Sequence, residues 1–251
     1  MQLSVALSAF TAAGLVACAA SAGTFQVTVT GTIEYNQITQ SPLNAGHAGN
    51  PASLTFQVDS ADFQDSASYP VRGYVINPES FVFTVNGASV GLNPNSPGPH
   101  YFVLRNNDPA VDGFYLSDAV DWPIGSELNC AHPSLGNFIE MFSVGYEGDA
   151  INSLNIADAV GTYDYTGLTN FYWAVSAGPF DPMGMIFEQL VISPVGAACP
   201  SDLNGDSVTD GTDLGLLLGN WGNAGTGDLN SDGIVDGTDL GLLLGAWGNC
   251  A

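Results

Sequence analysis

An acidic segment near the carboxyl end occurs twice and constrains this chain more than any other feature. Residues 202–222 read DLNGDSVTDGTDLGLLLGNWG, and residues 228–248 read DLNSDGIVDGTDLGLLLGAWG, 26 positions further on. Each copy places four aspartates within twelve residues and then leucines at helical spacing. Carboxylates crowded this closely repel one another unless a cation lies between them. The repeat therefore indicates two loops that a bound cation would order.

The spacing of the oxygen-bearing side chains matches the twelve-residue EF-hand calcium loop, with ligands at positions 1, 3, 5, 7, 9 and 12. Position 7 offers a backbone carbonyl, and its apolar side chain is expected to point inward. We therefore predict two Ca²⁺ ions, one in each loop. The predicted ligands are Asp202, Asn204, Asp206, Val208, Asp210 and Asp213 in the first loop, and Asp228, Asn230, Asp232, Ile234, Asp236 and Asp239 in the second.

A short apolar helix is predicted after each loop, from Thr212 to Trp221 in the first copy. Two glycines inside each helix cost about 1 kcal/mol apiece relative to alanine, and so short a helix is marginal alone. We therefore expect the order of this region to depend on calcium. The apolar residues expected on one helix face are Leu214, Leu217, Leu218 and Trp221, repeated as Leu240, Leu243, Leu244 and Trp247.

Two cysteines stand just outside the repeats, Cys199 before the first and Cys250 after the second. This placement predicts a disulfide that clasps the two ends, as oxidising compartments favour. Two unpaired thiols are the alternative. Cys130 is left without a partner and is expected to be a buried thiol.

The repeats resemble the type I dockerin. Both loops end in aspartate rather than glutamate, and no helix precedes either loop. The segment DGTDLGLLLGAWG (residues 236–248) is similar to a dockerin variant of secreted planctomycete-type proteins. The resemblance covers residues 199–250 and implies calcium binding and docking onto a cohesin domain, often in polysaccharide breakdown. The usual Ser/Thr-rich recognition pair is replaced by Gly211-Thr212 and Gly237-Thr238. An exposed face around Leu216 and Leu242 would dock on a partner or pack on the larger domain.

The amino-terminal segment, residues 1–22, has the pattern of a secretory signal peptide. Its core runs from Leu3 to Val16, and the small residues before Gly23 suit a cleavage site. A second interpretation is a lipoprotein box ending at Cys18, and a third is an uncleaved anchor. We expect a secreted or cell-surface protein, lipid-anchored if Cys18 is acylated. No other stretch is long and apolar enough for a transmembrane helix in the mature chain.

The charge balance excludes some partners. The formal net charge is −23, and the only basic residues are Arg72 and Arg105. Without a cationic patch the chain cannot bind nucleic acid by neutralising phosphates, and anionic membranes would repel it. Metal cations are the natural partners of such a surface.

Alternating apolar residues predict about nine short strands between residues 24 and 195. Asn86-Gly87 is a strong signal for a tight hairpin. Strands of this kind, separated by turn residues, predict a β-sandwich or jelly roll. The predicted fold class is thus mainly β: a signal peptide (1–22), a β-sandwich (23–195), and a small α-helical dockerin-like module with two EF-hand-type calcium loops (196–251).

Three hypotheses remain for residues 23–195. A glycoside hydrolase would need two carboxylates flanking a cleft, from among Glu34, Glu79, Glu127, Glu140, Glu147 and Glu188. A carbohydrate-binding module would stack sugars on aromatic rings, and the candidates are Trp122, Trp173, Tyr163 and Tyr165. Trp173 alternates with Val175 and is expected in the core, whereas Trp122, beside Pro123, is the better exposed candidate. A structural surface protein needs neither. We favour a binding or structural role over an enzyme, and no nucleophile motif or metal-ligating histidine spacing is present.

Overall fold

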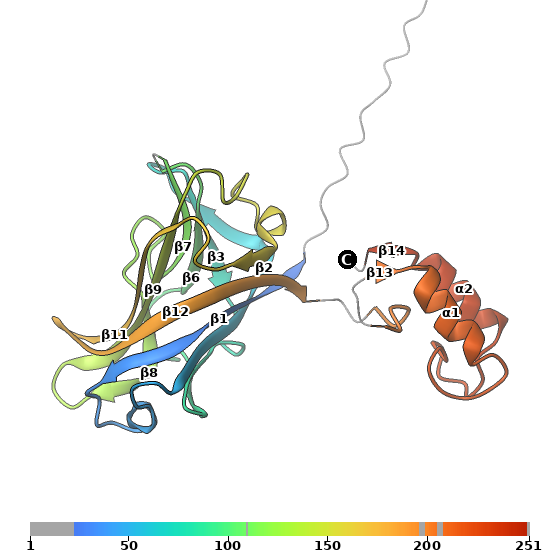
Figure 1. Cartoon of the computed structure of the whole chain (residues 1–251), viewed down its shortest axis with the longest axis horizontal. Coiled ribbons are helices and arrows are strands. Elements are labelled where there is room, and N and C mark those ends of the chain that lie inside the picture. Colours follow the sequence, from blue (N-terminus) through green and yellow to red (C-terminus); the bar gives the residue numbers. More distant parts are fainter. Residues whose placement is uncertain (1–22, 109, 196–198, 205–207, 250–251) are drawn as a thin grey trace, which may run out of the picture.

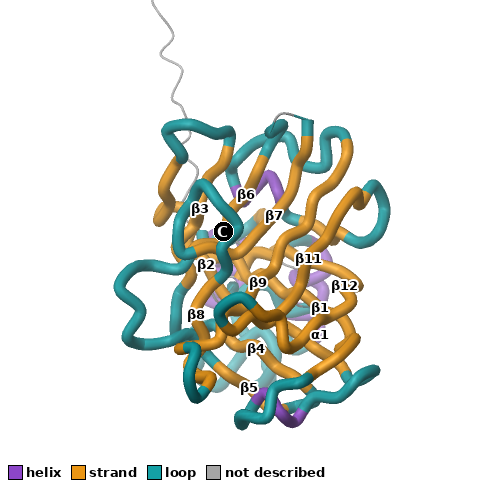
Figure 2. Tube along the Cα trace, turned by 90° about the vertical axis from the view of Figure 1, so that its left-hand side faces the viewer, coloured by secondary structure: helices purple, strands orange, loops and turns teal. Residues whose placement is uncertain are grey.

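The structure is a computed structural model that describes residues 23–108, 110–195, 199–204 and 208–249. The predicted signal peptide with Cys18, the candidate ligand Asp206 and the predicted clasp residue Cys250 lie outside the described residues. Strand dominates the described chain, and helix is confined to a few short segments (Figure 2). No helix within the described ranges is long and apolar enough to cross a bilayer.

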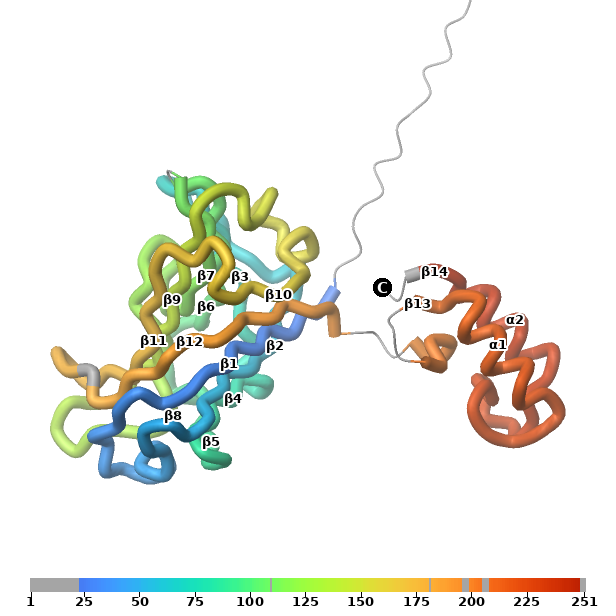
Figure 3. The backbone as a smooth tube through the Cα atoms, viewed as in Figure 1, coloured from blue at the N-terminus to red at the C-terminus, as the bar shows by residue number. Residues whose placement is uncertain are grey.

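Eight strands form one closed antiparallel sheet, a barrel (Figure 1). They are β1 (Thr24–Asn36), β2 (Pro51–Asp65), β3 (Val71–Ile76), β6 (Tyr101–Arg105), β7 (Val111–Ser117), β9 (Gly136–Glu147), β11 (Leu168–Ala177) and β12 (Phe180–Val195). The order around the barrel is β1-β12-β11-β9-β7-β6-β3-β2, and β2 pairs with β1 again. Four shorter strands extend the same sheet: β4 (Val82–Val85), β5 (Ala88–Val90), β8 (Ser126–His132) and β10 (Gly161–Tyr163). Figure 3 shows β10 beside β12.

This closure shows that the predicted fold class, a β-sandwich or jelly roll followed by a small α-helical EF-hand module, is wrong. A sandwich has two sheets packed face to face, but here one sheet curls until β1 bonds to β2 on one side and β12 on the other. Only two short α-helices occur in the described residues, α1 (Gly211–Gly219) and α2 (Gly237–Gly245). Closure leaves the long strands without free edges.

Two glycines allow neighbouring strands of the barrel to approach closely. A Cβ atom at Gly31 would lie 2.1 Å from the carbonyl oxygen of Ile186, where the β1–β12 register shifts. A Cβ atom at Gly113 would lie 2.2 Å from the carbonyl oxygen of Val144, on the neighbouring strand β9. Neither position accepts a side chain unless the strands separate.

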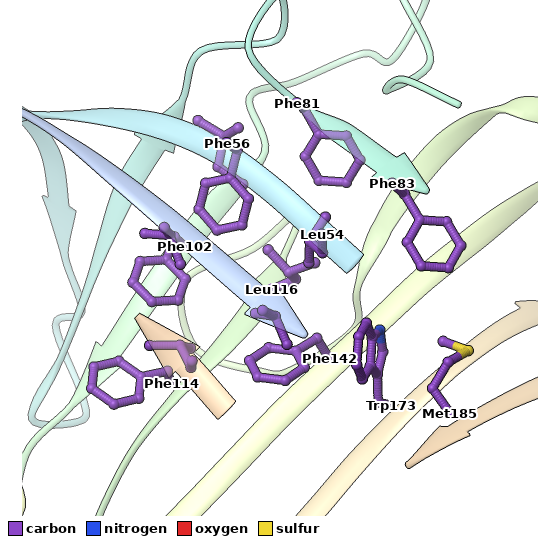
Figure 4. Packing of buried hydrophobic residues seen from close by; sticks show 14 of the residues in the cluster. Leu54, Phe56, Phe81, Phe83, Phe102, Phe114, Leu116, Phe142, Trp173 and Met185 are labelled. Carbon is purple, nitrogen blue, oxygen red and sulfur yellow. The ribbon is translucent and has the colours of Figure 1, made fainter. Parts of the chain in front are cut away.

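The barrel interior is filled by the side chains that the alternating pattern places there (Figure 4). Phe102 and Phe114 stack with ring centroids 5.7 Å apart. Phe142 meets Trp173 edge to face at 5.9 Å. Trp173 is only 3% exposed, which confirms the prediction that it belongs to the core. The Asn86-Gly87 hairpin is confirmed as well, since both residues have positive φ and join β4 to β5.

A second, smaller apolar cluster lies apart from the main core. It contains Val71 on β3, Tyr101 and Val103 on β6, Tyr115 on β7, and Val120 from the loop after β7. Tyr101, Val103 and Tyr115 alternate along their strands with main-core residues, so this cluster occupies the outer face of the sheet. The loop that follows Ser117 therefore covers the outside of the barrel here.

Candidate calcium loops in the carboxyl-terminal repeat

Each of the two helices begins with the same hydrogen-bonded cap. Asp210 is the N-cap of α1, and its Oδ1 accepts the N–H of Thr212 at 2.7 Å. The side chain of Asp213, the third residue after the N-cap, in turn accepts the N–H of Asp210 at 2.8 Å. The second copy repeats both bonds at 2.7 and 2.8 Å. A reciprocal cap of this kind satisfies two otherwise unpaired donors and places negative charge at the positive end of the helix dipole.

The aspartate at position 12 also fastens the start of each loop to the start of the helix. Oδ1 of Asp213 accepts the N–H groups of Leu203 and Asn204 at 2.7 and 3.1 Å. Oδ1 of Asp239 accepts the equivalent pair, from Leu229 and Asn230, at 2.8 and 3.1 Å. Both aspartates are 0% exposed. Three N–H donors on one buried carboxylate therefore bring each twelve-residue loop into a closed shape.

These bonds set the charge state of the two aspartates. Burial alone would raise the pKa of Asp213, but the N–H groups of Asp210, Leu203 and Asn204 together lower it below the ordinary value. The N–H of Asp236 is the largest cause of the lowered pKa of Asp239, and it acts against burial. Both carboxyl groups therefore stay ionised at neutral pH.

The second loop draws its first three candidate ligands together. Oδ1 of Asp228 and Oδ1 of Asn230 both accept the N–H of Asp232, at 3.1 and 3.0 Å. Oδ2 of Asp228 accepts the N–H of Gly233 at 2.9 Å, and Nδ2 of Asn230 donates to Oδ2 of Asp232 at 2.8 Å. Positions 1, 3 and 5 thus surround one short stretch of backbone. The corresponding bonds of the first loop involve Asp206 at position 5, which lies outside the described residues.

No group of three or more His, Cys, Asp or Glu residues that could hold a metal occurs in the described ranges. The oxygens of Asp228 and Asp239 accept backbone N–H groups instead. The donor chemistry nevertheless suits calcium, because every candidate ligand is an oxygen and the loop length is that of a calcium loop.

Position 7 of the second loop differs from the expectation. Ile234 is 44% exposed, whereas Val235, the next residue, is 0% exposed. Consecutive residues of an extended segment point to opposite sides, so only one of the two can reach the interior. Val235 does so because its N–H donates to the carbonyl of Asn223 and its own carbonyl accepts the N–H of Gly222, both at 2.9 Å.

The backbone hydrogen bonds of each loop are made with the other copy of the repeat. The second loop pairs with the segment after α1, through Gly222 and Asn223. The first loop, as β13 (Val208–Thr209), pairs with β14 (Gly248–Asn249) after α2. Helices α1 and α2 lie side by side (Figure 1). Each repeat therefore completes the other, and residues at position 8, Thr209 and Val235, are central to the arrangement.

A small apolar core holds the paired repeats together. Its fully buried members are Leu217, Val235 and Leu243, and Leu203, Leu214, Leu229 and Leu240 pack against it. The predicted single apolar stripe is therefore wrong in part, since Leu218 and Trp221 are 49% and 45% exposed. Sequence reasoning missed position 8 of each loop, although a β-branched residue recurs there in both copies.

Cys199 is disulfide-bonded. The partner that its position predicts, Cys250, lies outside the described residues, so the pairing itself stays a prediction. Cys130 is free and buried, as expected, and burial raises the pKa of its thiol.

Two of the candidate glutamates of the barrel, Glu127 and Glu140, lie on opposite faces of the sheet. Glu140 is 0% exposed and accepts Trp173 Nε1–H at 2.5 Å. Its Oε2 and the Oγ of Ser126, its cross-strand neighbour, have no hydrogen-bond partner among the described residues. Glu127 lies next to Ser126 in sequence and so on the other face of the strand, where it accepts from Asn93 at 2.9 Å.

Comparison with known proteins finds no matching family, no matching curated protein and no matching solved structure.

Proposed function

We propose that this is an exported calcium-binding protein whose carboxyl-terminal repeat takes up two Ca²⁺ ions, one per loop. The observation that carries the proposal is the duplicated closure of the loops. In both copies a buried aspartate at position 12 accepts the same three backbone N–H groups, at distances that agree within 0.1 Å. This closure brings the start of each twelve-residue loop to the start of the following helix.

The chain's own residues divide the work between shape and charge. The aspartates at positions 9 and 12 cap the helix and close the loop. The side chains at positions 1, 3 and 5 would supply oxygens to the ion. A bound Ca²⁺ would supply the positive charge that the crowded carboxylates lack, in a chain of net charge −23.

Isothermal titration of residues 23–251 with CaCl₂ tests the proposal. We expect uptake of two ions per chain, and of one ion in Asp202→Asn or Asp228→Asn, each of which loses the position 1 carboxylate. Asp149→Asn, an exposed acid outside the loops, is the matched control and should keep both. No heat of binding from the unchanged chain, or full uptake by the double variant, would contradict the proposal.

We further propose that the exposed surface around Leu216 of α1 and Leu242 of α2 docks on a cohesin-like protein. Matched apolar residues remain exposed in both copies: Leu216 39% and Leu242 48%, Leu218 49% and Leu244 51%, Trp221 45% and Trp247 50%. Exposure of the same apolar positions in both copies is the observation that favours a docking surface here. Immobilised cohesin should retain the chain with calcium and release it in chelator, and Leu216→Ser/Leu242→Ser should reduce retention. Val82→Ser, at an exposed valine of β4 (39%), is the control and should leave retention unchanged.

The barrel then acts as a binding or structural module displayed at the cell surface or released from the cell. Polysaccharide is the ligand class that fits such a setting. The alternative of a glycoside hydrolase has less support, because the only fully buried glutamate of the candidate set, Glu140, is bonded to a core tryptophan.

A further inference from the structure

A pocket of about 340 Å³ lies on the outside of the barrel beside the loop that follows β7. Its lining combines aromatic, amide and acidic side chains: Gln64, Tyr101, Asp118, Asp121 and Trp122, with Ala119 and Val120. This volume is within the range of small-molecule sites, which pair apolar surface with a few placed polar groups.

The loop that forms the pocket is fastened from below. Val120 is 4% exposed and packs in the outer apolar cluster, and its carbonyl accepts the hydroxyl of Tyr115 at 2.6 Å. The hydroxyl of Ser117 donates to the carbonyl of Trp122 at 2.5 Å. Because these anchors come from strand β7 itself, the position of Trp122 is set before any ligand binds.

Two polar side chains of the pocket are oriented by neighbours. His100, 3% exposed, contacts Oδ1 of Asp118 through its Nδ1 at 2.5 Å. The hydroxyl of Tyr101 donates to Oε1 of Gln64 at 3.0 Å. With that amide oxygen engaged, the amide N–H groups of Gln64 remain to donate, while the carboxylates of Asp118 and Asp121 accept.

Trp122 adds a broad apolar surface beside these polar groups. Its side chain is 58% exposed, unusually high for tryptophan. Tyr69 meets it edge to face, with ring centroids 5.3 Å apart and planes at 68°. An edge-to-face contact covers at most one face of the indole, so the other face stays clear of Tyr69.

We infer that this pocket binds a neutral carbohydrate, with a sugar ring stacked on Trp122 and its hydroxyl groups bonded to Asp118, Asp121 and Gln64. A pyranose has apolar C–H faces for an aromatic ring and equatorial hydroxyls that both donate and accept at its edge. The inference names the ligand of the barrel's proposed binding role and depends on no property of the calcium loops.

The charge of the pocket decides between classes of sugar. Asp118 and Asp121 line it, and Asp62 lies near enough to help raise the pKa of Tyr101, after the larger effect of burial. None of the pocket-lining residues is basic. Uronic acids and sulfated sugars would be repelled by these carboxylates, whereas a neutral sugar uses them as hydrogen-bond acceptors.

Isothermal titration of residues 23–251 with cellohexaose, xylohexaose and mannohexaose, and with hexagalacturonate as the anionic comparison, tests this. At least one neutral oligosaccharide should bind, and hexagalacturonate should not. Trp122→Ala should weaken binding by about tenfold, the upper end for loss of an aromatic contact, and Trp122→Tyr should recover part of it. Phe180→Ala removes an equally prominent aromatic, 63% exposed, and should leave affinity unchanged.

Thermal unfolding of each variant shows that the barrel remains folded. Calcium titration of the same variants separates the two proposals, since Trp122→Ala should still take up two ions. Absence of binding by all three neutral sugars, preference for hexagalacturonate, or equal affinity of Trp122→Ala and the unchanged chain would each overturn the carbohydrate site.

Discussion

Two adjacent leucines on α2 offer a sharp test of the small core that joins the repeats. Leu243 is 0% exposed and contacts the buried cluster, whereas Leu244 is 51% exposed. Leu→Ala removes the same three carbon atoms from either side chain. At about 0.8 kcal/mol per buried carbon group the transfer loss at Leu243 is about 2.4 kcal/mol, and the cavity left behind raises the expected cost to about 3 kcal/mol. At Leu244 the cost should stay within about 0.5 kcal/mol.

The larger loss of stability in Leu243→Ala should make the folding of the repeats more dependent on calcium. A core of so few residues supplies only a few kcal/mol, so Leu243→Ala should remove whatever order the repeats keep in chelator. Calcium at a hundred times its dissociation constant returns about 2.7 kcal/mol per site, enough to refold them. In Leu243→Ala about 3 kcal/mol of the calcium-binding free energy would be used to refold the repeats. The apparent calcium affinity of this variant should therefore be roughly a hundredfold weaker.

Hydrogen exchange followed by mass spectrometry measures this directly. Peptides that cover residues 211–245 should exchange fast in chelator and slowly in calcium for Leu243→Ala, while Leu244→Ala should match the unchanged chain. If both variants lose protection equally, or if neither does, then the buried cluster is not what holds the repeats together and the reasoning fails.

Three further predictions concern single groups. Asp236→Ala removes an N-cap bond and should destabilise the repeat region by about 1 kcal/mol, measured as faster exchange within α2. Burial raises the pKa of Glu140 well above its ordinary value, despite the bond from Trp173. The folded barrel therefore binds this proton more tightly, and urea unfolding should show stability falling as pH rises above about 4.3, the unfolded pKa, a fall that Glu140→Gln should lack. Gly113→Ala would place a Cβ atom 2.2 Å from the carbonyl oxygen of Val144 and should lower the barrel's unfolding free energy by roughly 1–3 kcal/mol.

Local patterns in the sequence predict local structure well in this chain. The alternation along β1 correctly places Val27, Val29 and Ile33 inside, because side chains of a strand alternate between its faces. The leucines after each acidic loop do form helices. The exposed position of Trp122 follows from its place beside proline in a turn-rich loop. Each of these features depends on neighbouring residues only.

Closure of the sheet could not be predicted in the same way. A sandwich strand and a barrel strand share one period of alternation, so the pattern of β1 is consistent with both. What distinguishes a barrel is that β1 bonds both to β2 and to β12. These two strands are separated by more than 100 residues of chain. Gly31 permits the close approach and the register shift between β1 and β12, but in sequence it looks like any other turn or bulge glycine.

The repeat shows the same limit on a smaller scale. Position-by-position comparison with a calcium loop identifies the oxygen-bearing side chains but treats each loop as complete in itself. In the structure each loop is finished by the strand-like segment after the other helix, through Val235 with Asn223 and through Thr209 with Gly248. One copy alone would leave these N–H and C=O groups unpaired. The duplication is therefore a structural requirement, and removal of either copy should unfold the one that remains.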